Sequence, residues 1–293
     1  MTRPRILLTN DDGIDAPGLA SLYEELTAIA DVTVIAPAEN QSGVGRTRNG
    51  TVTVSESPRG YRVTGTPADC VAFGLGGGVS AEFDFVVAGV NDGPNVGNYV
   101  VGRSGTVGAC IEASLLDTPG IAVSAYHSRD YHCYPAERYE FDRPAVVARR
   151  LLTRLSSTNA ATDIDVLNVN APVDLAAAPL RLTSLVVDYS QRVEYDPADG
   201  SVTDGYHESI PDRDASRGDP DGTDVELIDK TWPHVEGYEN PLEGAARYRD
   251  RYPEASDRRA LIDGAVSVSP LSSSLSAVDS PALASLVETI DET

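Results

Sequence analysis

The stretch RILLTNDDGIDAPGL, residues 5–19, indicates both the class of fold and the place to look for chemistry. A short apolar run at residues 5–9 has the character of a buried strand. Leucines at helical spacing follow from Pro17, a residue favoured in the first turn of a helix. Between the two lie the adjacent acids Asp11 and Asp12. Adjacent carboxylates repel each other, so either solvent or a bound cation must offset their charge.

Strand and helix signals go on alternating through the first 125 residues. Strands are predicted at residues 31–36, 83–89 and 121–125, a hairpin at 51–55 and 61–64, and helices at 17–30, from 66 and over 104–116. The glycine-rich run 74–78 follows a helix rather than a strand and is predicted to be a loop. This order of elements predicts an α/β fold with a mainly parallel sheet and right-handed crossovers.

The pattern continues less regularly beyond residue 140. It predicts a helix at 143–155, strands at 165–170 and 264–269, an extended, hairpin-like region beginning at 181–188, and a closing helix at 281–290. Residues 196–257 are dense in Asp, Gly, Pro and Arg, which is typical of long surface loops. We therefore expect a core of residues 1–190, completed by 258–293, and an irregular extended arm at 191–257 that is a candidate for exchange between subunits.

The chain is strongly acidic. Against 23 Lys and Arg stand 45 Asp and Glu, which gives a net charge of −22 over 293 residues, and Lys230 is the only lysine. Self-repulsion of this size disfavours a compact state unless salt screens it, which indicates a salt-adapted organism; an ordinary acidic protein is the alternative. A phosphate backbone would be repelled, so no nucleic acid polymer is expected as a partner.

Other bulk features bear on location. No apolar run reaches 18 residues, so neither a membrane span nor a membrane partner is expected. The first strand begins too near the N-terminus to leave room for a signal peptide. Three cysteines without a CxxC pair indicate reduced thiols rather than a disulfide framework. We therefore expect a cytoplasmic protein.

Polar side chains follow three of the predicted strands. The strand ends lead into Asn-Asp-Asp-Gly at 10–13, Pro-Ala-Glu-Asn-Gln-Ser-Gly at 37–43 and Val-Asn-Asp-Gly-Pro-Asn-Val-Gly at 90–97. In an open parallel sheet, ligands bind beyond the carboxyl ends of the strands. Carboxylate, hydroxyl and amide oxygens suit Mg²⁺, Mn²⁺ or Ca²⁺ and are poor ligands for zinc. Each segment taken alone is equally typical of an ordinary turn, and it is their common position that favours a metal site.

Residues 102–107, Gly-Arg-Ser-Gly-Thr-Val, open a predicted helix. The free N–H groups and positive dipole end of a helix N-terminus form an anion site, although a plain helix cap is the simpler alternative. Arg46, Arg48 and Arg103 could add positive charge there. The sequence contains no G-x-S-x-G elbow and no Walker loop, and its four histidines form no recognisable triad. These observations favour metal-assisted hydrolysis by water over covalent catalysis.

Five ordered motifs resemble those of the SurE family, the stationary-phase survival nucleotidases. They are ILLTNDDGIDAPGL, VIAPAENQSG, GTPADCV, VVAGVNDGPNVG and RSGTVGA, and VLNVNAP and GAVSVSPL resemble the later landmarks of the family. The resemblance implies a Rossmann-like three-layer core, an arm that makes homodimers or homotetramers, and a halophilic archaeon as the source of so acidic a member. The chain departs from the family pattern at Asn98, Tyr99 and Arg103 and within 196–257. These departures bear on substrate preference and arm geometry.

The resemblance also implies the activity. It indicates a divalent-metal-dependent phosphatase that acts on nucleoside monophosphates, a 5′-nucleotidase that also accepts 3′-nucleotides or short polyphosphate in the broadest reading. The metal ligands of the family fall on Asp11, Asp12, Ser42 and Asn91, which would hold one Mg²⁺ or Mn²⁺ per subunit, with Ca²⁺ as a stand-in in crystals. Asn95, Ser104, Gly105 and Thr106 match the positions that line the phosphate pocket and, with the two acids, form the predicted catalytic set.

Three rival interpretations remain at this stage. A phosphatase of the haloacid dehalogenase type needs an aspartate two residues before a second one, and the residue two before Asp12 is Asn10. A non-catalytic, metal-dependent nucleotide-binding or regulatory protein would use the same crevice without releasing phosphate. An acidic scaffolding protein would leave the ordered polar loops unexplained.

Overall fold

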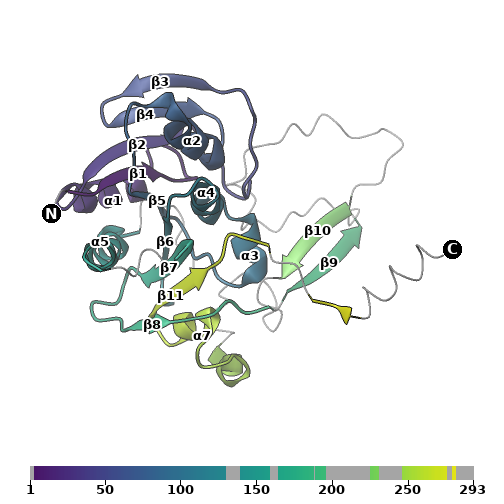
Figure 1. Ribbon diagram of the computed structural model, residues 1–293. Coiled ribbons are helices and arrows are strands. Elements are labelled where there is room, and N and C mark those ends of the chain that lie inside the picture. The colour runs from purple at the N-terminus through teal and green to yellow at the C-terminus, as the bar shows by residue number, and fades with distance from the viewer. Residues whose placement is uncertain are drawn as a thin grey trace.

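The computed structural model describes residues 3–129, 139–158, 164–187, 189–195, 225–230, 246–275 and 279–281. Its main sheet consists of β1 (Arg5–Thr9), β2 (Asp31–Pro37), β3 (Thr53–Ser57), β4 (Gly60–Thr64), β5 (Phe85–Asn91), β6 (Gly120–Tyr126), β7 (Val166–Pro172), β8 (Leu180–Leu182) and β11 (Val266–Leu271). The spatial order of these nine strands is β3-β4-β2-β1-β5-β6-β7-β11-β8 (Figure 1).

Most neighbouring strands of this sheet are parallel. The central run from β4 through β2, β1, β5 and β6 to β7 is parallel throughout, and β8 lies parallel to β11. Only β3 against β4 and β11 against β7 are antiparallel pairs within this sheet. The predicted mainly parallel α/β sheet is therefore confirmed, with antiparallel pairing restricted to its two flanks.

Helices cover both faces of the sheet, which gives the three-layer arrangement. One face packs under α1 (Pro17–Thr27) and α5 (Asp142–Ser156), and the other under α2 (Pro67–Phe73) and α4 (Gly105–Ser114) (Figure 1). Leucines of α1 at positions 19, 22 and 26 are almost fully buried in the first layer. Each fully buried leucine side chain contributes about 1.5–3 kcal/mol relative to exposure, so this helical spacing is what attaches α1 to the sheet.

The start of α2 follows the predicted capping pattern, and its end does not. Thr66 accepts a hydrogen bond from the backbone N–H of Asp69, whose carboxylate in turn accepts one from the Thr66 N–H. The glycine run 74–78 was predicted to be a loop, but η1 (Gly74–Gly78) extends the helix in a wider turn. A Cβ on Gly74 would lie 2.2 Å from Leu7 Cδ1, so glycine there lets the helix lie against the sheet.

The C-terminal third departs further from the expected pattern. The segment that begins with β8 pairs with β11 rather than with a following hairpin strand. An antiparallel pair, β9 (Ser190–Tyr195) and β10 (Val225–Lys230), lies beyond α3 (Asn98–Arg103) and away from the main sheet (Figure 1). β10 falls in the region predicted to be loops, and the short α3 was not predicted. Two further short helices are η6 (Ala246–Arg251) and α7 (Asp257–Ile262).

Parts of the predicted pattern lie outside the described residues. The predicted closing helix at 281–290 is described only at Pro281, and most of the predicted arm at 191–257 is likewise not described. The division into core and arm stays a prediction.

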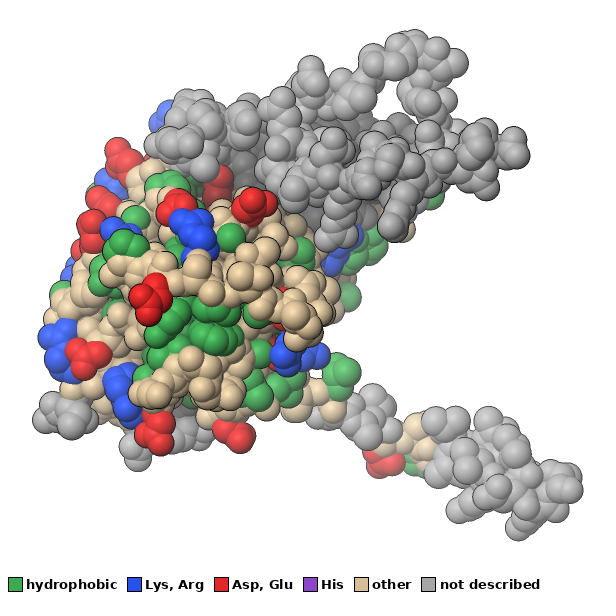
Figure 2. All heavy atoms as spheres, turned by 90° about the horizontal axis from the view of Figure 1, so that it is seen from above, with side chains coloured by type: hydrophobic (Ala, Val, Ile, Leu, Met, Phe, Trp, Pro, Cys, Tyr) green, Lys and Arg blue, Asp and Glu red, His purple; other side chains and the backbone are tan. Residues whose placement is uncertain are grey.

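Charged side chains of both signs lie on the surface formed by the described residues. On the face drawn in Figure 2, arginines and acids are interspersed among the coloured residues and no continuous basic stripe is visible. None of the helices in the described part of the chain has the length and apolar character needed to cross a bilayer.

Candidate functional site

The three polar loops predicted to converge do so at one edge of the sheet. β2, β1 and β5 are parallel neighbours, so their carboxyl ends meet there. The backbone N–H of Gln41 donates to the carbonyl of Asp11 at 2.6 Å, which joins the loop after β2 to the loop after β1. The N–H of Asp92 donates to Asp12 Oδ2 at 3.4 Å, which joins the loop after β5 to the same site.

Asp11 is buried against the N-terminus of α4. The hydroxyl of Thr106 donates to Asp11 Oδ1, and the nearby backbone N–H groups of Gly105 and Thr106 favour the charged form of this carboxylate. Burial raises the pKa of Asp11, and these hydrogen bonds offset only part of the increase. The sequence interpretation placed Ser104, Gly105 and Thr106 around a phosphate. That role stays a prediction; in the structure the Thr106 hydroxyl contacts Asp11, and Ser104 caps the helix by accepting from the Val107 N–H at 3.1 Å.

Gly105 is the position that permits this approach. A Cβ at Gly105 would lie 2.8 Å from both the Cβ and the Oδ2 of Asp11. Real carbon contacts do not reach that distance, so any side chain there would displace the Asp11 carboxylate. The glycine thus fixes the carboxylate directly beneath the first turn of α4.

Asp12 adds a second acid with a strongly perturbed pKa. Burial is the largest cause of its raised pKa, followed by the negative charges of Asp11 and Asp92. Asp92 was not singled out in the sequence, although it follows Asn91 directly at the end of β5. Three carboxylates therefore lie close enough to disfavour one another's charge, which is the condition that a bound cation relieves.

Ser42 and Asn91 border these acids with further oxygen donors. Ser42 follows Gln41, and its backbone N–H donates to Asn40 Oδ1 at 2.8 Å, which fixes the turn. The amide nitrogen of Asn91 donates to the carbonyl of Gly93 at 2.6 Å. This bond uses the nitrogen and leaves the amide oxygen as the atom that a hard cation would bind.

The donor set fits a hard divalent cation and not zinc. All candidate ligands are oxygens, namely two carboxylates, a hydroxyl and an amide. Among the described residues, no group of three or more His, Cys, Asp or Glu side chains has the geometry of a metal site. A cation here would therefore depend on Ser42 and Asn91 as well as on Asp11 and Asp12.

Asn95 lies in a buried amide network over the next two strands. Its amide nitrogen donates to Ser124 Oγ at 2.9 Å, and its backbone N–H donates to Asn170 Oδ1 at 2.7 Å. The carbonyl of Asn95 accepts from Asn168 and Asn170 at 2.9 and 3.1 Å. The two asparagines of the VLNVNAP segment, on β7, thus fix the backbone of Asn95. No role was predicted for these asparagines or for Ser124, although the VLNVNAP segment resembles a landmark of the family.

The loop that carries Ser42 is also attached to α4. Glu112, buried on α4, accepts from Arg46 at 2.8 Å and from Arg48 at 3.4 Å. Glu112 thereby anchors the loop four and six residues after Ser42. Arg46 and Arg48 were considered as positive charge for an anion site, and the structure shows that they pair with this acid instead. Glu112 itself carried no signal in the sequence.

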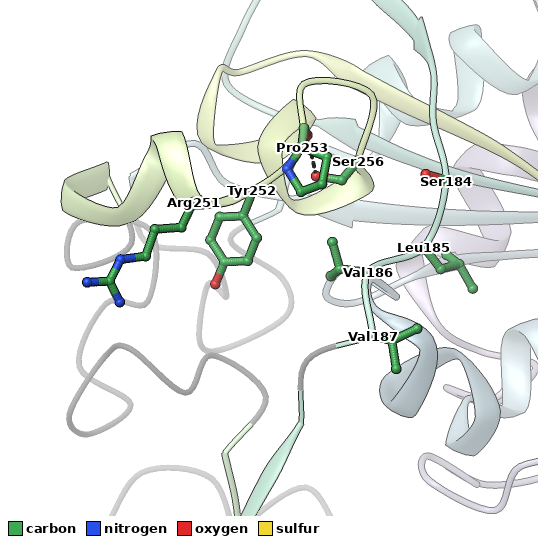
Figure 3. A pocket seen from close by; sticks show the side chains of 8 residues that line it. All are labelled: Ser184, Leu185, Val186, Val187, Arg251, Tyr252, Pro253 and Ser256. Atoms are coloured by element: carbon green, nitrogen blue, oxygen red, sulfur yellow. Dashed lines mark hydrogen bonds between the residues drawn. The ribbon is translucent and has the colours of Figure 1, made fainter.

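A separate cavity of about 340 Å³ lies elsewhere. It is lined by residues of the segments 184–187 and 251–256, with the ring of Tyr252 facing Val186 (Figure 3). None of the predicted site residues lines it. His127, the one histidine in the described residues, lies 3.7 Å from Asp174 after β6 and β7 and forms no part of the carboxylate site.

Comparison with known proteins connects this geometry to a family. Residues 6–192 match the family model described as Survival protein SurE. A protein named 5′-nucleotidase SurE from Haloarcula marismortui is 38% identical over 295 residues, which cover 99% of this chain and 97% of the relative. Its namesake from Natronomonas pharaonis is 37% identical, with 97% of this chain and 98% of the relative covered.

Solved structures agree. The crystal structure of the SurE protein from Aquifex aeolicus superimposes with a TM-score of 0.66 at 26% identity, and 99% of each chain is covered. The two archaeal relatives come from halophiles, in agreement with the salt-adapted origin expected from the acidic composition. The family match spans most of the chain and includes the three loops at the carboxyl edge of the sheet, so the chain belongs to the SurE family.

Proposed function

We propose that this protein is a divalent-metal-dependent phosphatase that hydrolyses nucleoside monophosphates to nucleoside and phosphate, a 5′-nucleotidase. The observation that carries the proposal is the meeting of Asp11, Asp12 and Asp92 at the carboxyl edge of the sheet, where no described histidine or cysteine takes part. The relatives named 5′-nucleotidase SurE support the substrate class.

Asp11, Asp12, Ser42 and Asn91 would hold one Mg²⁺ or Mn²⁺ in this proposal. A bound divalent cation supplies charge stabilisation at a phosphoryl oxygen and lowers the pKa of a water molecule. Thr106 and Gly105 orient the Asp11 carboxylate, and Asn95 borders the same edge from the side of β6. Asp11 or Asp12 would in addition orient the attacking water.

Three features of the proposal go beyond this site. We place the enzyme in the cytoplasm, assign it a small nucleotide substrate rather than a nucleic acid polymer or a membrane, and expect a homodimer or homotetramer. The activity extends to 3′-nucleotides and short polyphosphate only if the crevice tolerates them. The division into a core and an exchanged arm at 191–257 belongs to the same proposal.

Phosphate release from a panel of nucleoside monophosphates tests the function. Assays at high salt with Mg²⁺, Mn²⁺ or EDTA should give release that EDTA abolishes. Asp12→Asn should lower turnover by at least about 10³-fold, because the change removes a charge of the site. The melting temperature should stay near that of the wild type, because Asn and Asp side chains are almost equal in volume. Asp15→Asn is the matched control. Asp15 lies three residues after Asp12, is exposed, and pairs with Arg62 at 2.7 Å.

The outcomes separate the rivals. Nucleotide binding without phosphate release under any cation would favour a non-catalytic binding protein and contradict the proposal. Full activity of Asp12→Asn would contradict the site, even if the enzyme were a phosphatase. A trapped phospho-enzyme would point to covalent catalysis.

A further inference from the structure

Two tyrosine rings and an arginine form a cluster immediately before α4. The rings of Tyr99 and Tyr189 stack with centroids 3.6 Å apart and planes 13° from parallel. The guanidinium carbon of Arg103 lies 5.3 Å from the Tyr99 ring centroid, and Arg103 also donates to the Tyr99 hydroxyl. Tyr189 is 38% exposed, so an aromatic surface of this cluster faces solvent. We call Tyr99, Tyr189 and Arg103 the aromatic platform.

Backbone contacts hold the two halves of the platform together. The N–H of Asn98, at the start of α3, donates to the carbonyl of Val186 at 2.8 Å. The fully buried carboxylate of Asp257 accepts from the N–H of Gly97 at 2.6 Å and from the N–H of Val186 at 3.2 Å. One buried acid therefore joins the segment before Tyr99 to the segment before Tyr189.

The platform is connected to the candidate site through the end of α3 and through the loop that carries Ser42. Tyr99 and Arg103 are four residues apart on α3 and share one helix face. At 1.5 Å per residue, Tyr99 lies about 6 Å along α3 from its last residue, Arg103, and Ser104 follows directly as the N-cap of α4. The carbonyl of Arg103 accepts from the N–H of Gly45 at 2.9 Å, in the loop that carries Ser42. The distance along α3 between Tyr99 and Arg103 is of the order of one ribose between a phosphate and a base.

We infer that the aromatic platform binds the nucleobase of the substrate by stacking, while the carboxylate site takes the phosphate. This inference rests on the proposed function and adds to it the group that selects nucleotides over other phosphomonoesters. Every base has a π face, so stacking accepts purines and pyrimidines and favours the larger purines. Arg103 adds a cation–π contribution to the same rings. We therefore expect a broad base preference with purines ahead.

The test separates base recognition from phosphate chemistry. Tyr99→Leu removes the ring but keeps an apolar side chain, and Tyr99→Phe keeps the ring. Tyr23→Leu is the matched control, because Tyr23 on α1 also carries an arginine, Arg59, 4.8 Å from its ring centroid but lies outside the platform. Each variant is assayed with AMP and with ribose 5-phosphate, and binding of adenosine is titrated by calorimetry.

We expect Tyr99→Leu to lower the ratio of kcat/KM for AMP to that for ribose 5-phosphate by about 5- to 150-fold, the loss that one base–aromatic stack produces. Adenosine affinity should fall by a similar factor. Tyr99→Phe and Tyr23→Leu should both keep the kcat/KM ratio and the adenosine affinity of the wild type. If Tyr99→Leu does not fold, Tyr189→Leu carries the same expectation.

Several results would overturn the inference. An equal loss on AMP and ribose 5-phosphate would assign Tyr99 to the structure of α3, and a change in oligomeric state of the variant would assign the rings to a subunit interface. Undiminished adenosine affinity in Tyr99→Leu, or no adenosine binding by the wild type, would have the same effect. Absence of phosphate release from both substrates would refute the phosphatase instead, and the adenosine titration would still decide the platform.

Discussion

Gly105→Ala changes one methyl group at the point where α4 meets the candidate site. The new Cβ would lie 2.8 Å from Asp11 Cβ and Oδ2 and 3.2 Å from Asp11 Cγ. Ordinary carbon contacts begin near 3.5 Å, so the two groups must separate by about 0.7 Å or more. The helix is fixed to the sheet by buried residues on its other side, so we expect the Asp11 side chain to move.

Stability and activity should respond differently to this change. Alanine favours a helix over glycine by up to about 1 kcal/mol, whereas overpacking costs about 1–3 kcal/mol, so the free energy of unfolding should fall by no more than about 2 kcal/mol. Displacement of the carboxylate weakens its hydrogen bond from Thr106. A misplacement approaching 1 Å at a reacting site lowers turnover by about 10²-fold.

Three measurements test this reasoning, namely urea unfolding, Mn²⁺ binding by calorimetry, and phosphate release from AMP. The matched control is Gly102→Ala, because a Cβ there would meet no atom within 4 Å. The control should keep full activity and equal or slightly higher stability. If Gly105→Ala kept both its Mn²⁺ affinity and its kcat/KM within threefold of the wild type, the position assigned to Asp11 in the site would be refuted.

Three further changes test the supports of the site. Glu112→Gln should lower the free energy of unfolding by about 1–2 kcal/mol, measured in urea, because the two half-exposed arginines lose their buried charged partner. An equal loss from Asp117→Asn, an exposed acid just beyond the C-terminal end of α4, would show a general charge effect. Asn170→Ala leaves the backbone N–H of Asn95 without its acceptor and should lower that free energy by about 2–4 kcal/mol together with kcat; unchanged kcat in a folded variant would separate Asn95 from the site. The hydrogen bond from the Ser273 N–H is the main reason that the pKa of Asp165 lies below its usual range, so its stabilisation is complete above about pH 4, the unfolded pKa, and is lost as pH falls through the folded value. Unfolding free energies at pH 6 and pH 3 should therefore differ less in Asp165→Asn than in the wild type, and an equal difference would contradict this.

The parts of the fold that follow from local pattern were predictable. The strands through β6, the leucine face of α1 and the capping box at Thr66 are each set by residues within a few positions of one another. Such signals are read directly from periodicity and cap chemistry. They also place the three polar loops at one edge of the sheet, because parallel strands require it.

Elements that depend on distant residues were not predictable in this way. The six residues of α3 contain two adjacent valines and a glycine, which are weak helix formers. Contacts to Val186 and Asp257 fix the start of this helix, and those residues are 88 or more positions away. The glycines at 74–78 indicated a loop by composition, whereas Gly74 is needed for contact with Leu7.

The candidate site shows the same limit at the level of single bonds. The acids and the helix start at 104–106 were each visible in the sequence, but the hydrogen bond between Thr106 and Asp11 spans 95 positions. The Thr106 hydroxyl thus contacts a protein carboxylate, which the expectation of a phosphate pocket at residues 104–106 did not include.

The contact between Asp11 and the first turn of α4 bears on how an anion enters so acidic a protein. With a net charge of −22, the chain repels a nucleotide at long range, and high salt reduces that repulsion. At the site itself, Asp11 lies at the first turn of α4 and accepts from Thr106, and Arg46 and Arg48 pair with Glu112. The proposed cation is therefore the principal positive charge offered to the phosphate by these described groups. Phosphate affinity should then depend on the divalent cation far more steeply than base affinity does. Titrations of inorganic phosphate and of adenosine, each with Mn²⁺ and with EDTA, distinguish the two dependences: equal sensitivity of both ligands to EDTA would contradict this division of the site.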